Sequence, residues 1–155
     1  WWTAWNVAKE RPTGGGFEMF RAPIFKIYAP EPENVHDVHS VYFEVLGEHG
    51  FVGLSLWLLL AFLTWLTGSW VIRNAKRDPG KRWAADLAAM GQVSMIGYFA
   101  AGAFLGLAYF DLYYHILMII ILAKVIMLQE AKAKPRVEVE VVDKRGGANG
   151  MRRRV

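Results

Sequence analysis

The sequence predicts an all-α integral membrane protein, in which a periplasmic loop with an amphipathic helix is followed by three transmembrane helices. Two uncharged stretches lead to this prediction: 51–72 has 22 residues and 87–110 has 24, without an Asp, Glu, Lys or Arg. A bilayer core about 30 Å thick needs about 20 apolar helical residues. Of the 155 residues, 54% are hydrophobic, and cysteine is absent. This pattern excludes an ordinary soluble domain, a disordered chain and a disulfide-rich secreted module.

Residues 1–50 are predicted to lie outside the membrane. Residues 1–36 are polar and contain several glycines and prolines, which indicates a loop with one short helix over Trp1–Lys9. The run Gly14–Gly16 lacks the Gly-Lys-Ser/Thr of a Walker loop and is expected to form a tight turn. From Val38 onward, apolar residues recur at helical spacing. We expect an interfacial helix that starts near Ser40 and leads through Gly50 into the first span.

The three spans are expected at about 51–72, 87–110 and 112–128. The loop 73–86 holds five basic and two acidic residues, and 112–155 holds nine basic and four acidic ones, whereas 1–50 has a net charge of −3. Because Lys and Arg beside short loops mark the cytoplasmic side, residues 1–50 are placed outside and the tail 129–155 inside. That tail is expected to be disordered. Gly102 and Gly106 form a Gly-x-x-x-Gly pattern that predicts close helix packing in the second span.

Two further expectations concern the extent of the protein and its partners. The chain begins at Trp1 rather than Met, so we expect it to be the C-terminal part of a longer membrane protein. The basic residues are not clustered in the way that nucleic-acid binding requires, so no nucleic-acid partner is expected. The lipid bilayer is the partner that the composition indicates.

Three of the four histidines, His36, His39 and His49, fall within fourteen residues before the first span. His36 and His39 could be metal ligands, but their i, i+3 spacing differs from the i, i+4 spacing of the zinc-binding helix. They could equally be solvated residues at the interface. A third interpretation is that one of them is a general base, because a neutral imidazole can take a proton from an attacking hydroxyl. The residues alone do not select among these.

A longer motif surrounds these histidines. It consists of His39-Ser40, a short amphipathic run with Glu44, and Gly50-x-x-Gly53 at the start of the span. It resembles the signature of the O-antigen ligase/polymerase superfamily of bacterial inner-membrane proteins. The upstream Trp2-Thr-Ala-Trp5 segment and the later Ala-Tyr109-Phe-Asp-Leu-Tyr-Tyr-His115 make the chain most similar to putative O-glycosylation ligases associated with exosortase A systems. The resemblance covers about residues 1–128.

The resemblance implies a metal-independent, inverting glycosyltransferase without a cofactor. Such enzymes move a glycan from an undecaprenyl-diphosphate carrier to an acceptor hydroxyl on a lipid, protein or polysaccharide in the periplasm. His39 takes the position of the base. Arg11 and Arg21 are the outer-side arginines that could hold the diphosphate, while other arginines of the family are expected before Trp1.

Ser40 and Glu44 are further candidate substrate contacts. Glu44 could orient the imidazole or the acceptor, or could cap the polar face of the helix. Two alternatives to a ligase remain open: a polymerase of the same superfamily, and a non-enzymatic membrane subunit.

Overall fold

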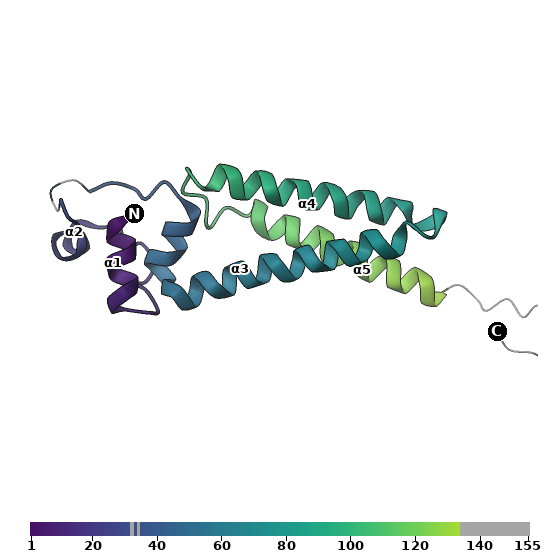
Figure 1. Cartoon of the computed structure of the whole chain (residues 1–155), viewed down its shortest axis with the longest axis horizontal. Coiled ribbons are helices and arrows are strands. Elements are labelled where there is room, and N and C mark those ends of the chain that lie inside the picture. Colours follow the sequence, from purple (N-terminus) through teal and green to yellow (C-terminus); the bar gives the residue numbers. More distant parts are fainter. Residues whose placement is uncertain (32, 34, 134–155) are drawn as a thin grey trace, which may run out of the picture.

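The computed structural model describes residues 1–31, 33 and 35–133, and every regular element in this part of the chain is helical. The elements are α1 (Trp2–Glu10), α2 (Ala22–Tyr28), α3 (Val41–Ala75), the 3₁₀ turn η1 (Pro79–Lys81), α4 (Arg82–Gly102) and α5 (Leu112–Ala133). The long helices α3, α4 and α5 pack against one another, and α1 and α2 lie at the end where α3 begins (Figure 1). The predicted all-α class is confirmed.

The N-terminal segment contains one helix that the sequence predicts and one that it does not. α1 matches the helix expected over Trp1–Lys9, and its Thr3, Ala4, Val7 and Ala8 form a buried face. α2 differs from the expectation of a single helix in residues 1–36. Pro23 stands in its first turn, where a fixed φ suits a helix start and the missing N–H costs nothing. Seven residues are too few for a periodic apolar pattern to reveal the helix.

α3 is two helices joined at Gly50, whose φ of 66° and ψ of −165° are not helical. We call residues 41–49, which precede this kink, the arm. The arm is the helix that the sequence predicts between Ser40 and Gly50. The part beyond the kink, 51–75, is about 37 Å long at 1.5 Å per residue, which exceeds the bilayer core.

α4 lies at different residues from the second expected span, because it runs over Arg82–Gly102 rather than 87–110. Residues 103–111, here called the α4–α5 loop, turn back toward α5. The Tyr98 hydroxyl fastens this turn by donating to the Leu107 carbonyl at 2.6 Å. Gly102 lies against Val41, but Gly106 is in the loop, so the two glycines are not a packing motif on one helix. Glycine is a weak helix former, which fits an end at this point.

α5 continues beyond the predicted end of the third span at residue 128. It reaches Ala133, so the start of the expected tail 129–155 is helical. The rest of that tail, 134–155, lies outside the described residues. Within α5, the Lys124 ammonium lies 5.1 Å from the centre of the Trp70 ring of α3, which gives this charge an aromatic partner.

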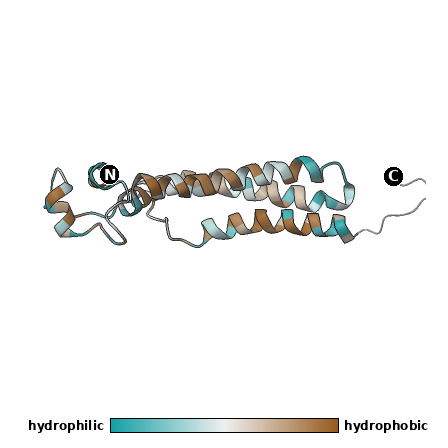
Figure 2. Cartoon of the chain, turned by 90° about the horizontal axis from the view of Figure 1, so that it is seen from below, coloured by the Kyte–Doolittle hydropathy of each residue, from teal (hydrophilic) through white to brown (hydrophobic). Residues whose placement is uncertain are grey.

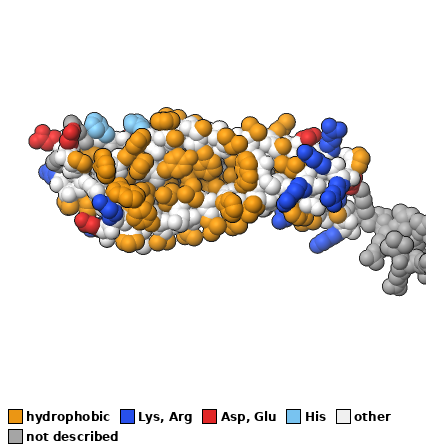
Figure 3. Space-filling model, viewed as in Figure 1, with side chains coloured by type: hydrophobic (Ala, Val, Ile, Leu, Met, Phe, Trp, Pro, Cys, Tyr) orange, Lys and Arg blue, Asp and Glu red, His pale blue; other side chains and the backbone are white. Residues whose placement is uncertain are grey.

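α3 and α5 are long and apolar enough to cross a membrane, each containing an 18-residue stretch with a mean hydropathy of 1.9, while α4 does not meet the same criterion. Only 22% and 33% of their most apolar stretches are buried inside the protein. The hydrophobic residues run along the middle of the long helices, and the polar ones gather at the ends (Figure 2). On the face in Figure 3, Lys and Arg cluster at the η1 end and the visible His lie at the other. Outward-facing apolar helices favour a bilayer as their surroundings.

Candidate functional site

The loop of residues 12–16 closes the kink in α3. The non-helical Gly50 turns the following amides away from the carbonyls of Gly47 and Glu48, which would otherwise be their helical acceptors. Instead, the N–H groups of Gly15 and Gly16 donate to these two carbonyls, at 2.8 and 2.9 Å. The two backbone carbonyls at the bend are therefore hydrogen-bonded to the N-terminal loop.

Close approach explains why this contact is built from glycines. A Cβ at Gly50 would lie 2.0 Å from the Pro12 carbonyl oxygen, and one at Gly14 would lie 2.3 Å from the Glu48 carbonyl oxygen. Gly14 also has a φ of 81°, as expected for the predicted tight turn. In the other direction, the Val52 N–H donates a hydrogen bond to the Pro12 carbonyl at 3.3 Å. The arm is thus fixed relative to both the loop and the long part of α3.

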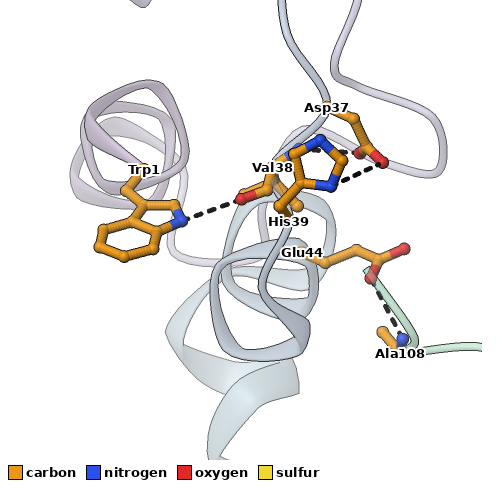
Figure 4. Close-up of polar contacts among 6 residues, drawn as sticks. All are labelled: Trp1, Asp37, Val38, His39, Glu44 and Ala108. Atoms are coloured by element: carbon orange, nitrogen blue, oxygen red, sulfur yellow. Dashed lines mark hydrogen bonds and ion pairs between the residues drawn. The ribbon is translucent and has the colours of Figure 1, made fainter. Parts of the chain in front are cut away.

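His39 stands directly before the arm in a rare backbone conformation. Its φ is 43°, and Glu18 is the only other non-glycine residue with a positive φ in the described chain. Such conformations cost free energy and are concentrated at functional sites. The segment is held from the side, because the Trp1 indole N–H donates to the Val38 carbonyl at 2.9 Å (Figure 4).

Asp37 and His39 form a pair at this position (Figure 4). Asp37 Oδ2 lies 3.9 Å from His39 Nδ1, while Oδ1 accepts the Val38 N–H at 2.8 Å. The His39 side chain is 70% exposed. At 3.9 Å the carboxylate and Nδ1 are not hydrogen-bonded, and the imidazole is open to the outside. An exposed imidazole in its neutral form can take a proton from a group that approaches it.

Glu44 fastens the α4–α5 loop to the arm. Its carboxylate accepts the Ala108 N–H at 3.1 Å (Figure 4). In the same loop, a Cβ at Gly106 would lie 3.4 Å from Asp37 Oδ2. The loop thus lies beside the Asp37–His39 pair. The Glu44 carboxylate contacts a backbone amide of this loop. The described hydrogen bonds do not join Glu44 to the His39 imidazole, which it was expected either to orient or to leave alone as a cap of the helix.

The end of the arm carries a second polar cluster, which the sequence analysis did not predict. Glu48 is only 5% exposed, and its carboxylate accepts the Glu18 N–H at 2.7 Å and the Tyr109 hydroxyl. The same hydroxyl lies 3.0 Å from His49 Nε2. Burial, followed by the hydrogen bond to Glu48, raises the pKa of Tyr109 above its ordinary value. The i, i+4 spacing of Glu44 and Glu48 is visible in the sequence. Their partners in the α4–α5 loop, Ala108 and Tyr109, are 64 and 61 positions away and are not.

The remaining candidate residues lie in different surroundings. Ser40 is 1% exposed, and its role as a substrate contact stays a prediction. Arg11 is exposed and ends α1, with its N–H on the Val7 carbonyl at 2.7 Å. Arg21 is exposed and forms an ion pair with Glu18, next to the loop that caps the kink. In the described chain, no three His, Asp or Glu side chains converge as metal ligands.

Comparison of the chain with family models, with characterised proteins and with solved structures finds no match. The site is therefore defined here by its own geometry: a His–Asp pair at the start of the arm, and a buried carboxylate at its end.

Proposed function

We propose that this protein is a glycan ligase, which transfers a glycan from an undecaprenyl-diphosphate carrier to an acceptor hydroxyl at the periplasmic face of the bacterial inner membrane. The observation that carries the proposal is the Asp37–His39 pair, because it combines an exposed imidazole with a carboxylate near Nδ1. It lies at the end of the bundle opposite the basic turn. The resemblance of residues 39–53 to the signature of O-antigen ligases supports the same role for His39.

In the proposed reaction, the acceptor hydroxyl attacks the anomeric carbon of the glycan. His39 Nε2 takes the hydroxyl proton as the new C–O bond forms, and Asp37 stabilises the imidazolium that results. The C–O bond to the diphosphate breaks, and the electron pair leaves with the lipid diphosphate. A single displacement of this kind inverts the anomeric configuration.

The leaving diphosphate requires positive charge. Guanidinium groups match phosphate oxygens in a bidentate manner, and they stabilise the charge that develops on the leaving group. Arg11 and Arg21 are the two candidates; both are exposed, and Arg21 forms an ion pair with Glu18. No cofactor is assigned to the reaction.

The charge distribution supports the proposed orientation in the membrane. α3, α4 and α5 would each cross the bilayer, with the basic η1 turn in the cytoplasm and the arm in the periplasm. Although α4 is less apolar than its neighbours, it has 21 residues, about 31 Å in length, and it packs against both of them. A site beside the bilayer surface suits a substrate whose reactive group is carried by a lipid.

The test is His39→Ala in the protein expressed in its native membrane, with His36→Ala as the matched control. We expect the rate of glycan transfer to fall about 10²–10⁴-fold, the usual contribution of a positioned acid–base group. His36→Ala removes a neighbouring exposed imidazole and should retain most activity. Immunoblots of the membrane fraction check that both variants insert normally.

Analysis of the glycans made by the His39→Ala variant and by a gene deletion separates the alternatives. Loss of glycan attachment with normal glycan length supports the ligase. Loss of chain length instead would identify a polymerase. A fully active His39→Ala variant would contradict the proposed chemistry, and unchanged glycans after gene deletion would indicate a non-enzymatic subunit.

A further inference from the structure

One aromatic side chain near the site is exposed without an evident structural reason. Phe17 is 71% exposed, yet its ring lies edge-on to His49, with 4.8 Å between ring centres, and 5.6 Å from the ring of Tyr109. We call Phe17, His49 and Tyr109 the aromatic surface. Phe17 comes from the N-terminal loop, His49 from the arm and Tyr109 from the α4–α5 loop. Three distant segments therefore meet to form it.

The backbone holds Phe17 firmly in this exposed position. On one side of it, the Gly16 N–H donates to the Glu48 carbonyl at 2.9 Å. On the other side, the Glu18 N–H donates to the Glu48 carboxylate at 2.7 Å. Glu18 itself has a positive φ of 54°, a conformation that non-glycine residues adopt at a cost. Glu48 is thus a positioning residue, which fixes an apolar ring toward the outside.

We infer that the aromatic surface binds a sugar ring of the transferred glycan. A pyranose has a face of C–H groups, which packs on an aromatic ring, and a rim of hydroxyls, which need polar partners. Glu18, the next residue, supplies an exposed carboxylate beside Phe17. A ring that is already fixed loses little conformational entropy on binding, so its contact contributes more to affinity.

The location agrees with a subsite that is separate from the reacting bond. The arm, residues 41–49, separates His39 from the aromatic surface and is about 13 Å long at 1.5 Å per residue. A sugar on this surface would therefore lie beyond the one that reacts. This inference rests on the proposed function and adds a binding site to it. The other conceivable neighbour of an exposed phenylalanine is the bilayer surface. The exposed carboxylate of Glu18 beside the ring favours the glycan, because sugar hydroxyls can donate hydrogen bonds to it.

The test is Phe17→Ala, with Ile27→Ala on α2 as the matched control, because Ile27 is 72% exposed and lies apart from the site. We expect Phe17→Ala to raise KM for the lipid-linked glycan about tenfold, equivalent to about 1.4 kcal/mol, with kcat nearly unchanged. Phe17→Tyr keeps the ring and should restore KM. Ile27→Ala should leave both constants as in the wild type.

A binding measurement separates this inference from the proposed reaction. The probe is the oligosaccharide released from the cell's own lipid carrier, titrated onto purified His39→Ala protein in nanodiscs. Phe17→Ala in that background should weaken the affinity about tenfold. If the affinity and KM are unchanged while His39→Ala abolishes transfer, the aromatic surface is not a sugar site and the ligase proposal stands. If His39→Ala transfers normally, the ligase proposal fails.

A third measurement tests the bilayer as the alternative neighbour. The chain has no cysteine, so Phe17→Cys can carry a single spin label. We expect the label to be accessible to a water-soluble nickel relaxant. A label that is accessible only to oxygen dissolved in the lipid would overturn the inference.

Discussion

The two ends of the helical bundle are built in different ways. At the end with the arm, hydrogen bonds join residues far apart in sequence: Glu48 binds the amide of Glu18, 30 positions away, and Glu44 binds the amide of Ala108, 64 positions away. At the η1 end, Asp78 accepts the N–H of Gly80, only two positions away. The first end brings three loops together, whereas the second only reverses the chain direction.

This difference indicates where function is located. Ordering a long loop costs conformational entropy, which local turns largely avoid. The arm end also contains both non-glycine residues with positive φ in the described chain, Glu18 and His39. The η1 end carries positive charge, five basic and two acidic residues over 73–86, and a charge excess requires no particular side-chain geometry. We therefore expect substitutions to matter more at the arm end.

The largest effect on the fold is expected from Gly50→Ala. A φ of 66° with a ψ of −165° is accessible almost only to glycine, and the new Cβ would lie 2.0 Å from the Pro12 carbonyl oxygen. The loop of residues 12–16 would have to leave the kink. We expect loss of folded protein, or a melting temperature many degrees lower, measured by circular dichroism in detergent.

Gly97→Ala is the control for this substitution. Gly97 lies inside α4, and a Cβ there would meet nothing within 4 Å. Alanine in a helix interior is better than glycine by about 0.5–1 kcal/mol, so the melting temperature should stay or rise slightly. Equal behaviour of the two variants would show that the kink does not require its present geometry.

A smaller effect is expected from Tyr109→Phe, which removes the hydroxyl that Glu48 accepts. A buried carboxylate that loses one partner costs about 1–3 kcal/mol. Thermal unfolding at pH 7 should show this loss. The control is Tyr28→Phe, which removes a hydrogen bond to Glu10 at the exposed surface. The melting temperature of that variant should be close to that of the wild type. An equal loss of stability in both variants would mean that the hydrogen bond to the buried Glu48 contributes no more than the exposed one.

The pH dependence of this difference has a definite sign. The pKa of Tyr109 is raised above 10 in the folded protein by burial and by Glu48. Above pH 10 the unfolded chain releases the phenol proton while the folded protein keeps it, so unfolding becomes more favourable. Tyr109→Phe has no such proton. The difference in melting temperature between the two proteins should therefore shrink between pH 7 and pH 11, and a growing difference would contradict this assignment.

The sequence predicts the helical class and the arm, because these depend on local patterns. Apolar spacing over Val38–Leu46 and the uncharged run 51–72 are both local. The same reasoning places the end of α4 too late, since the uncharged run continues through Phe110 while the helix ends at Gly102. The Tyr98 bond to Leu107 that shapes this end is a tertiary contact, which no charge count reveals.

The candidate site was predictable only in part, for the same reason. His39 and Glu44 follow from a motif, and Arg21 from its place on the outer side. The pairing of Glu48 with Tyr109, in contrast, joins residues 61 positions apart. The burial of Ser40 was also not visible, because a serine before a helix usually faces solvent as a cap. Local spacing indicates which residues share a helix, whereas the partners of a buried carboxylate depend on how the loops meet.

The smallest effect is expected at the η1 end, from Lys81→Gln. The Lys81 ammonium lies 3.7 Å from Asp78 Oδ2, and ion pairs near the surface contribute about 0–1 kcal/mol. Loss of this pair should lower the melting temperature less than Tyr109→Phe does, and added salt should reduce the difference further. The rate of the proposed glycan transfer should be unchanged, because the turn between α3 and α4 lies at the opposite end of the bundle from the start of α3 (Figure 1). A tenfold loss of transfer in this variant would mean that the basic end takes part in the reaction, and the contrast between the two ends would no longer locate the site.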